Sequence, residues 1–556
     1  MASQPARPGG ASAGDPSSAA GAPLLVAEHA PLVVVGAGPA GLSAALAAAK
    51  AGIATVLVDE HPVESALMGL DVPYHFGQRM NAAVQSKGRM IERIAETDPR
   101  LSEAFEAGID LRLGTCVAGA FVSGPSASSL RKPVLMLADG ERSWLMSFDR
   151  LIVAAGARDL GLGFAGWEKP GVMGARGAMA LLRRYHAFDG RTLLVMGSGA
   201  VGMQIAFAAL DSGIAVAGIV EIEAAVRGPE AMRAELARRG VPFYLRHAVK
   251  EAVGGAEVEG AVLLRLDAEG RAVAGSEARV ACDTIVTAIG LVPNVELLDL
   301  LGCRLAFRSE LGGYVPELDE EGRSSVPCVF AAGDCAGTFE GKLVDDNIAR
   351  AEGALAAAGA ARDLGAVAAP PPESAARRHE PGEVHGYWQA WLAAEIAVGG
   401  WDVTVCQCEE VTRRELVELR PPRYLGWGGS QVAARNIERL AAEGPLNQDQ
   451  VKRLTRAGMG HCQGRRCREQ VQMLLAIAGK VPVAAVPLAS YRPPVRPLPL
   501  GICGPQDEPR EIREHWTAWF NIPTQWTPHW EPTPVAGSQP APDISGLGGP
   551  APGDER

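Results

Sequence analysis

The sequence lacks any hydrophobic run that could cross a membrane. No apolar stretch among its 556 residues approaches the roughly 18 residues that a membrane-spanning helix needs. Residues 1–30 also lack the compact charged start and apolar core of a secretion signal, and their alanine, glycine, proline and serine content predicts a disordered leader. We therefore expect a cytoplasmic protein without a transmembrane segment.

Cysteine and positive charge are scarce as well. Ten cysteines in 556 residues are too few for a disulfide scaffold and fit a reducing compartment. No two of them are spaced C-x-x-C, which argues against the redox dithiol of many disulfide reductases. The net charge of −11 leaves no broad basic face, and we therefore expect no nucleic-acid partner.

What the sequence does have is a glycine-rich turn near its start. Residues 31–62 predict a buried strand, a turn, a long helix and a second strand. Gly36, Gly38 and Gly41 form G-x-G-x-x-G, which permits a tight turn, close approach of a pyrophosphate and close packing of the helix. Asp59, 18 residues beyond Gly41, is placed to bind a ribose, with Glu60 as its alternate. This combination predicts a dinucleotide site.

The same order of strand, turn, helix and strand recurs at residues 191–222. Gly197, Gly199 and Gly202 repeat the glycine pattern, and Glu221 follows 19 residues beyond Gly202. An acid at this position suits a free ribose 2′-hydroxyl and would repel a 2′-phosphate, so NAD(H) is favoured over NADP(H). The alternatives are a domain kept as a scaffold and a domain that holds another adenine nucleotide.

A third segment, VFAAGDCAG at residues 329–337, carries a late Gly-Asp pair, Gly333–Asp334. Together with the two turns, it resembles the large class of flavoproteins with two dinucleotide-binding domains. In that class the early turn binds FAD, the inserted domain binds a nicotinamide nucleotide, and the late pair contacts the flavin. The resemblance implies an FAD site that includes a displaced Gly-Gln-Arg turn at 77–79, and its predicted residues are Gly36, Gly38, Pro39, Ala40, Gly41, Asp59, Glu60, Gln78, Arg79, Val117, Ala155, Gly156, Gly333 and Asp334.

Four of the cysteines form two pairs in the C-terminal third. Cys406 and Cys408 are spaced C-x-C, Cys462 and Cys467 are spaced C-x4-C, and 53 residues separate the pairs. Four thiolates can hold either a zinc ion or an iron–sulfur cluster, and spacing alone does not decide. A neighbouring flavin favours the redox centre, because zinc carries no electrons. The segment TRAGMGHCQGRRC also resembles the bacterioferritin-associated-ferredoxin type of [2Fe–2S] domain.

These parts occur in one order in a family that the chain resembles: the FAD- and [2Fe–2S]-containing subunit of heteromeric dye-linked amine and amino-acid dehydrogenases. The group includes opine oxidases, hydrogen cyanide synthase, proline and hydroxyproline dehydrogenases and the large subunit of sarcosine oxidase. The resemblance implies a second FAD-dependent subunit that oxidises a small amine or amino acid, with FMN at a subunit interface as a further candidate cofactor. The sequence identifies no general acid, base or nucleophile.

Two other functions stay open at this point. The chain could be an NADH-dependent flavin reductase that passes electrons through the cluster to a partner. It could also be a non-enzymatic scaffold with a four-cysteine zinc knot.

The expected fold is α/β, with two nested doubly wound dinucleotide-binding domains and a small helical [2Fe–2S] domain. The expected parts are a leader (1–30), an FAD-binding domain in two pieces (31–165 and 285–365), a second Rossmann domain of NAD(H) type (166–284), a linker (366–400), the [2Fe–2S] domain (401–480), an extended Pro- and Trp-rich partner-docking tail (481–535) and a disordered end (536–556).

Overall fold

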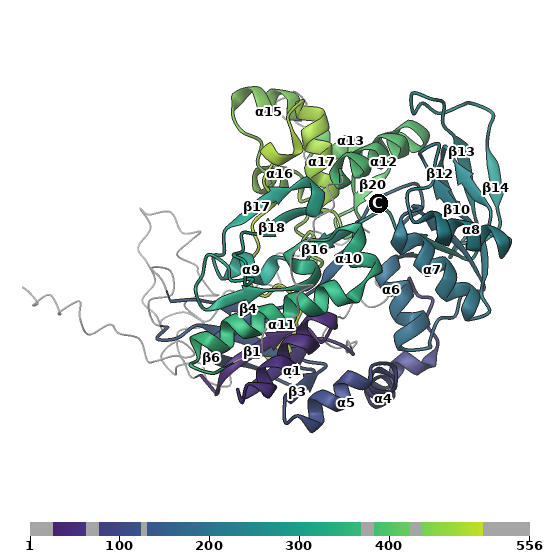
Figure 1. Cartoon of the computed structure of the whole chain (residues 1–556). Helices are drawn as coiled ribbons and strands as arrows, with labels where there is room; N and C mark the ends of the chain where they lie inside the picture. The colour runs from purple at the N-terminus through teal and green to yellow at the C-terminus, as the bar shows by residue number, and fades with distance from the viewer. Residues whose placement is uncertain (1–25, 63–76, 124–129, 368–382, 423–434, 504–556) are drawn as a thin grey trace, which may run out of the picture. The chain divides into compact units, whose positions relative to one another are not determined.

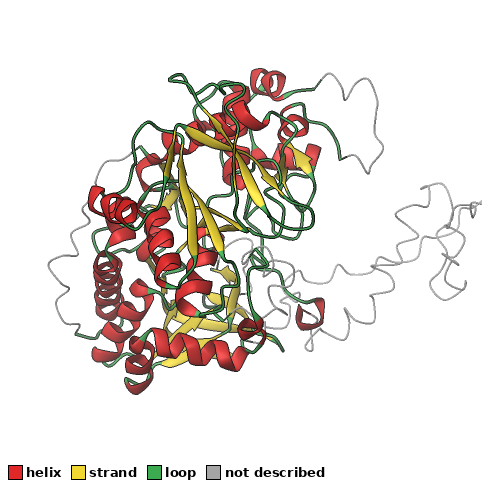
Figure 2. Cartoon of the chain, turned by 90° about the vertical axis from the view of Figure 1, so that its right-hand side faces the viewer, coloured by secondary structure: helices red, strands yellow, loops and turns green. Residues whose placement is uncertain are grey.

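The structure is a computed structural model that describes residues 26–62, 77–123, 130–367, 383–422 and 435–503 (Figure 1). These residues form α/β sheets with helices packed alongside the strands (Figure 2). The predicted α/β fold with Rossmann-like sheets is therefore confirmed. No helix in the described part of the chain is long and apolar enough to cross a membrane.

The first sheet carries the early glycine-rich turn. Its order is β3-β2-β1-β6-β5-β4, with β19 paired to β6, and β1, β2, β3, β6 and β19 pair in parallel. The sheet therefore joins the early turn to the late Gly-Asp pair, as expected for a domain built from two pieces of chain. Its strands are β1 (Glu28–Val35), β2 (Thr55–Asp59), β3 (Asp110–Leu113), β4 (Cys116–Phe121), β5 (Val134–Ala138), β6 (Ser143–Val153) and β19 (Val329–Ala331).

Two helices, α1 (Pro39–Lys50) and α11 (Asp346–Asp363), lie side by side against this sheet (Figure 1). Proline suits the first position of α1, because the N–H that it lacks has no partner inside a helix there. A Cβ atom on Gly353 would lie 1.9 Å from the carbonyl oxygen of Ala40, so glycine is required where the helices meet. The other helices of this part are α4 (Lys87–Thr97), α5 (Pro99–Glu106), α9 (Glu296–Leu300) and α10 (Glu340–Val344).

The second sheet is parallel throughout, in the order β11-β10-β9-β15-β8. Its last strand runs to Thr287, so the expected boundary at residue 284 is wrong by part of a strand. A three-stranded antiparallel sheet follows in order β12-β13-β14. The elements are β8 (Val172–Gly174), α6 (Ala175–Met179), β9 (Thr192–Met196), α7 (Ala200–Asp211), β10 (Ala215–Glu221), α8 (Glu230–Arg238), β11 (Phe243–Leu245), β12 (His247–Val253), β13 (Gly260–Arg265), β14 (Ala278–Val280) and β15 (Thr284–Thr287).

Short antiparallel pairs connect these sheets and the cysteine-containing part. Strand β7 (Ala157–Asp159) pairs with β16 (Leu291–Pro293), and β17 (Leu305–Arg308) pairs with β18 (Gly313–Pro316). The cysteine-containing part is mostly helical, as expected, and its α13 begins with a capping box between Thr412 and Glu415. Its elements are β20 (Thr404–Cys406), β21 (Val411–Thr412), α13 (Arg413–Val417), α15 (Ile437–Glu443), α16 (Gln448–Thr455) and α17 (Arg468–Gly479).

The expected linker at 366–400 is wrong over its second half. Residues Val384–Gly399 form helix α12, in which Trp388 and Trp391 are fully buried. Apolar residues surround this helix on most sides, so it packs as a core element of the fold. Residues 368–382 lie outside the described residues.

The first part of the expected docking tail also packs inside the fold. The backbone N–H of Val495 donates to the carbonyl of Ala118 at 2.7 Å, and the hydroxyl of Ser143 donates to the carbonyl of Ile502 at 2.5 Å. Residues 491–503, which end in the short helix α18 (Leu500–Cys503), therefore cover part of the first sheet. The tryptophan-rich stretch 515–530, the expected disordered end at 536–556 and residues 1–25 of the expected leader lie outside the described residues. The expected leader (1–30) is wrong at its end, because strand β1 begins at Glu28.

Candidate functional site

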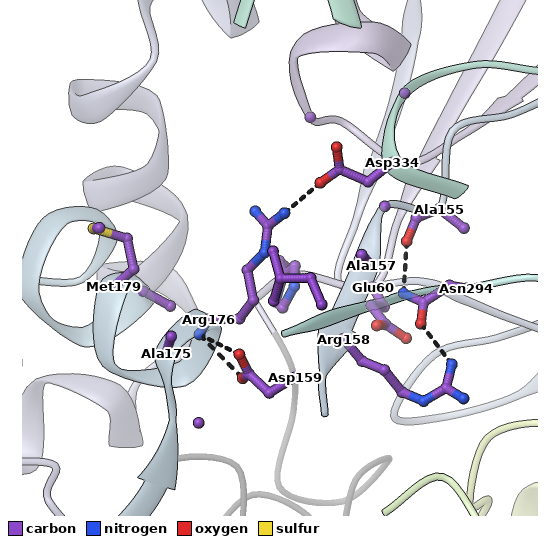
Figure 3. Close-up of a pocket in the computed structure, with 18 of the residues that line it drawn as sticks. Glu60, Ala155, Ala157, Arg158, Asp159, Ala175, Arg176, Met179, Asn294 and Asp334 are labelled. Carbon is purple, nitrogen blue, oxygen red and sulfur yellow. Dashed lines mark hydrogen bonds and ion pairs between the residues drawn. The ribbon is translucent and has the colours of Figure 1, made fainter. Parts of the chain in front are cut away.

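A cavity of about 700 Å³ opens at the carboxyl ends of the first sheet (Figure 3). Its volume falls within the usual range for small-molecule and cofactor sites. The cavity brings together residues from four distant segments of the sequence, as the resemblance implied. The predicted residues that line it are Gly36, Gly38, Pro39, Ala40, Asp59, Glu60, Val117, Ala155, Gly156, Gly333 and Asp334.

The early glycine turn has the geometry of a phosphate-binding turn. Gly36 has φ +105°, and a Cβ there would lie 2.2 Å from the carbonyl oxygen of Ala154. Gly41 is not at the cavity but beneath the turn, where a Cβ would lie 1.7 Å from the carbonyl oxygen of Gly36. In contrast, a Cβ on Gly38 would meet no atom within 4 Å, because it would point into the open cavity. The N-terminus of α1 is thus left free for an anionic group.

The two adjacent acids at the end of β2 have different roles. Both carboxylate oxygens of Asp59 accept main-chain hydrogen bonds, from the N–H of Ala37 at 2.5 Å and the N–H of His61 at 2.7 Å. Asp59 therefore holds the shape of the turn. Glu60 projects into the cavity (Figure 3) and pairs with the guanidinium of Arg496 at 2.7 Å. We therefore assign the cavity-facing acid to Glu60.

Arg496 is a cavity residue that sequence reasoning missed. It belongs to the proline-rich segment 491–501, which we expected to extend away from the fold, but its side chain lies in the cavity and is 15% exposed. Burial raises the pKa of Glu60, but the charge and hydrogen bond of Arg496, together with the charges of His61 and Arg465, outweigh burial and lower that pKa from 4.5 to about 2. The C-terminal segment thus completes the cavity with a partly buried ion pair.

The Glu60–Arg496 pair predicts a defined dependence of stability on pH. A carboxylate with a lowered pKa stabilises the fold fully above about pH 4.5 and loses this contribution as the pH falls toward about 2. Because Glu60 is 31% exposed, we expect Glu60→Gln to lower the free energy of unfolding by about 1–2 kcal/mol at neutral pH. Denaturant unfolding of both proteins between pH 7 and 3.5 tests this, and a difference that does not shrink with acid would contradict the pairing.

The other end of the cavity is organised around Asp334. The guanidinium of Arg176 donates to the Asp334 carboxylate, and the backbone N–H of Arg176 donates to both carboxylate oxygens of Asp159 at 3.0 Å (Figure 3). Burial raises the pKa of Asp159 to about 6, although the backbone hydrogen bonds from the start of α6 act to lower it. Arg176 lies in the expected second Rossmann domain (166–284), so its contact with Asp334 is a long-range one that no local pattern indicates.

A buried ion pair between Lys342 and Glu352 holds the backbone of the Gly-Asp turn. Lys342 and Glu352 lie 2.9 Å apart and are 2% and 3% exposed. The N–H of Gly333 donates to Glu352 at 2.8 Å, while Lys342 donates to the carbonyl of Gly333 at 3.1 Å. Gly333 itself has φ +75°, which favours glycine. The pair therefore fixes the backbone that presents Asp334, and no sequence pattern indicated it.

The predicted flavin residues Gln78 and Arg79 are not among the residues that line the cavity. Arg79 instead donates to the carbonyl of Asp283 at 2.6 Å and pairs with Glu257 at 2.6 Å. Gly77 and Gln78 have positive φ angles, and the carbonyl of Gly77 accepts from the N–H of Gly171. This turn therefore joins the first domain to the second, where Arg79 is engaged, and a flavin contact of Gln78 stays a prediction.

The second glycine turn does not line the cavity. Gly197, Gly199 and Gly202 form a turn at the start of α7 like the first, but Glu221 is completely buried. Three other residues of α7 do reach the cavity: Val201, Gln204 and Ile205.

The four predicted cysteines come together in a small pocket. The sulfur of Cys408 lies 3.9 Å from that of Cys406 and 3.6 Å from that of Cys462, and Cys467 is within hydrogen-bonding reach of Cys406. The N–H of Gly458 donates to the sulfur of Cys406 at 3.4 Å. The fold thus brings together two cysteine pairs that lie far apart in the sequence.

The donor set of this pocket suits a thiolate-bound metal group. The neighbouring Cys406 thiol raises the pKa of Cys408 to about 11, and Cys408 raises the pKa of Cys462. Thiolates this close together would repel one another unless a metal group lay between them. No group of three or more His, Cys, Asp or Glu side chains among the described residues is arranged to hold a metal ion. The contacts link the four sulfurs in a row, in the order Cys467, Cys406, Cys408 and Cys462.

The cavity and the cysteine pocket share a wall. Gln407 and Arg466 line both, and the Arg466 guanidinium donates to the Gln407 amide oxygen at 3.0 Å. Gln407 stands between the first pair of cysteines, and Arg466 directly precedes Cys467. The wall is therefore made from the residues that carry the cysteines.

Arg158 fastens this wall to the first domain. It lines the cavity and pairs with Glu296 at 3.1 Å and with Glu469 at 2.6 Å, and it donates to the carbonyl of Arg465 at 3.1 Å. Burial disfavours its charge, but Glu469 and Glu296 outweigh burial and raise the pKa of Arg158. An ion pair between β7 and the start of α17 thus fixes the cysteine pocket at the cavity.

Comparison with known proteins identifies two families along the chain. Residues 30–358 match the pyridine nucleotide-disulphide oxidoreductase family, and residues 429–506 match the sarcosine oxidase A3 domain. The first match spans both glycine turns and the late Gly-Asp pair. The second includes Cys462 and Cys467 but not the first cysteine pair.

Similar proteins support the same grouping. The chain is 26% identical over 498 residues to the A subunit of opine oxidase from Rhizobium meliloti, covering 84% of this chain and 86% of that protein. It is 27% identical over 470 residues to hydrogen cyanide synthase subunit HcnB of Pseudomonas aeruginosa, covering 78% and 90%. The crystal structure of L-proline dehydrogenase from P. horikoshii has the same fold, with a TM-score of 0.55, 19% identity and coverage of 86% and 80%.

These findings confirm the resemblance that the glycine turns and the Gly-Asp pair carried. The family binds FAD, and the cavity presents the residues expected to hold it. The chain therefore belongs to the pyridine nucleotide-disulphide oxidoreductase family, as a flavin-dependent oxidoreductase similar to the opine oxidase and hydrogen cyanide synthase subunits.

Proposed function

We propose that the chain is the FAD- and [2Fe–2S]-dependent electron-transfer subunit of a heteromeric amine or amino-acid dehydrogenase. The observation that carries the proposal is the wall of Gln407 and Arg466, which lines both the FAD cavity and the cysteine pocket. Because electron transfer needs two centres close together in a fixed geometry, a shared wall held by Arg158 is the arrangement that this function requires.

Each part of the site has a defined task in this proposal. The turn at Gly38 and the N-terminus of α1 bind the FAD pyrophosphate, Glu60 binds the ribose, and Asp334 faces the flavin side of the cavity. FAD exchanges electrons in twos or singly, and a [2Fe–2S] cluster carries one at a time. The residues that would hold the cluster are Cys406, Cys408, Cys462 and Cys467.

The substrate and partner follow from the similar proteins. The relatives from opine oxidase and hydrogen cyanide synthase are by their names subunits of larger enzymes. We infer that a second FAD-dependent subunit oxidises a CH–NH group to an imine, which releases two electrons and two protons. This chain accepts the electrons, and no residue in its cavity is assigned as the base that removes a substrate proton.

The structure also suggests a revised domain layout for this function. We propose an FAD-binding domain at 31–165 and 288–365, a second Rossmann domain at 166–287, and a cluster-binding domain at 401–480. Helix α12 and the segment 491–503 then serve as elements that close the other domains.

Purification of the tagged full-length chain from its native cells tests the proposal. We expect a second flavoprotein to copurify, and we expect the complex to reduce dichlorophenolindophenol with at least one of glycine, N-methylglycine, proline or octopine. The Arg158→Met variant removes the ion pairs that hold the shared wall in place. It should lower the rate of dye reduction more than it lowers flavin content. A chain that purifies alone and reduces the dye only with NADH would contradict the proposal.

A further inference from the structure

The crevice of the second Rossmann domain is filled by the protein's own helix α12. In doubly wound domains, nucleotides bind outside the carboxyl ends of the strands, between the glycine turn and the acid of the second strand. In this chain, those positions are Gly197–Gly202 and Glu221. Helix α12 lies beside β12 (Figure 1) and packs in one hydrophobic cluster with residues from the strand ends of the second sheet.

The carboxylate of Glu221 already accepts four hydrogen bonds from the protein. Its carboxylate accepts hydrogen bonds from the N–H of Ser198 at 3.2 Å and the hydroxyl of Ser198 at 2.5 Å. It also accepts from the N–H of Glu223 at 3.1 Å and from the hydroxyl of Tyr387, on α12, at 2.8 Å. Glu221 is 0% exposed. A ribose hydroxyl could reach this acid only by displacing Tyr387.

The glycine turn is covered from the other side by residues 223–229. The backbone N–H of Arg227 donates to the hydroxyl of Ser198 at 3.1 Å, and the N–H of Gly228 donates to the carbonyl of Ser198 at 3.0 Å. The guanidinium of Arg227 lies 4.2 Å from the ring centre of Tyr387. Helix α12 and this loop therefore contact each other at the position where the ribose of a nucleotide would bind.

The tryptophans of α12 pack against the strand ends of the second sheet. Trp388 and Trp391 are fully buried. The indole nitrogen of Trp388 would lie 2.1 Å from a Cβ on Gly290, which stands at the strand end that faces the second turn. Both tryptophans belong to the cluster that contains Met196, Val220 and Ile289. Removing them from this cluster would expose two large aromatic rings to water.

The first domain shows what an open site looks like in the same chain. There the N–H of Ala37 donates to Asp59 in the way that the N–H of Ser198 donates to Glu221. The next residue in the first domain is Glu60, which lines an open cavity, whereas the matching residue in the second is Ile222. The second turn thus keeps its internal hydrogen bonds but lacks a free acid.

We propose that α12 permanently occupies the nucleotide site of the second Rossmann domain, so that this domain binds neither NAD(H) nor an adenine nucleotide. Tyr387 takes the place of the ribose hydroxyls, and Trp388 fills the part of the crevice beside Gly290, while a Cβ on Gly199 would still meet no atom within 4 Å. The inference deepens the proposed function, on which its consequence rests: reducing equivalents enter through the partner subunit and not from NADH. The expectation of an NAD(H)-type domain is withdrawn.

Ligand binding by the full-length flavin-containing protein tests the inference. Equilibrium dialysis with NAD⁺, NADH and ATP, each at millimolar concentration, should show no saturable binding. Anaerobic mixing with NADH should leave the flavin absorbance unchanged over minutes, while photoreduction bleaches it in the same sample. Saturable binding of any of the three nucleotides, or rapid bleaching by NADH, would overturn the inference.

Hydrogen exchange gives a second readout that does not depend on turnover. The amides of residues 387–396 should exchange slowly, and their rates should be the same with and without NADH or ATP. Slower amide exchange at residues 197–202 when a nucleotide is added, or fast exchange throughout α12, would contradict permanent occupation of the site by α12. Flavin and iron contents report on the proposed function separately, because neither depends on whether the second site is closed.

Discussion

Replacing Gly38 with alanine is expected to strip FAD from a protein that still folds. Gly38 has φ −75° and ψ −175°, which alanine adopts freely, and a Cβ there meets no protein atom within 4 Å. The methyl group would instead stand where the pyrophosphate approaches the main chain. We expect FAD affinity to fall about 100-fold, roughly 2.7 kcal/mol, measured by flavin release and by unfolding with and without added FAD.

Gly199→Ala is the matched control for this prediction. Gly199 begins α7 with φ −69° and ψ 179°, and a Cβ there also meets no atom within 4 Å. Because the second site is closed by α12, flavin content and dye reduction should stay at the level of the unchanged protein. Gly36→Ala would be a poor test, because its positive φ and its contact with Ala154 make misfolding the expected result. Equal effects of Gly38→Ala and Gly199→Ala would contradict the assignment of FAD to the first turn.

Replacing Cys408 with serine is expected to abolish the metal centre while FAD stays bound. Cys408 is the sulfur that lies near both Cys406 and Cys462, so its loss removes a ligand at the middle of the row. Serine is a poor ligand for iron at neutral pH compared with a thiolate. We expect near-complete loss of iron and acid-labile sulfide, unchanged flavin content, and a strong fall in the rate at which photoreduced protein reduces a one-electron acceptor such as ferricyanide.

The control for the cysteine variant is Cys503→Ser. Cys503 is exposed at the end of α18 and far in sequence from the other cysteines, so its replacement should change neither iron content nor rate. If Cys408→Ser keeps its iron, or if its loss of iron leaves the rate unchanged, the cysteine pocket is not part of the electron path.

Local sequence patterns predicted the parts of the site that depend on backbone geometry. Gly36 needs a positive φ, Gly41 lies against the turn, and Gly38 leaves room for a pyrophosphate, and each requirement acts within a few residues. The spacing from Gly41 to the end of β2 follows from the length of α1. The two cysteine pairs were equally visible, because their spacing within each pair is short.

Contacts between distant segments were missed. Arg496 reaches Glu60 from 436 residues away, and Lys342 meets Glu352 beneath the Gly-Asp turn. The prolines around Arg496 disfavour regular structure and therefore predict a tail. Prolines also suit an extended segment that runs along the edge of a sheet. Tertiary packing decides which oppositely charged residue a buried charge contacts. This choice leaves no periodic pattern in the sequence.

Helix α12 was missed for a different reason. It follows a proline-rich stretch, and it is apolar on most sides, so neither a polar face nor a strand-like alternation marked it. The second glycine turn predicted a nucleotide whose ribose position is taken by Tyr387, because the pattern specifies the turn and not what covers it. The residue that occupies the ribose position, Tyr387, lies 166 residues beyond Glu221 in the sequence.

We propose that one chain holds FAD and a thiolate-bound iron–sulfur cluster as neighbouring redox centres. The most direct test is anaerobic photoreduction of the purified full-length protein, followed by metal analysis and low-temperature paramagnetic resonance. We expect one FAD per chain, iron and acid-labile sulfide each at about two per flavin, and a paramagnetic signal that appears on reduction. One zinc per chain, with no iron and no such signal, would contradict it.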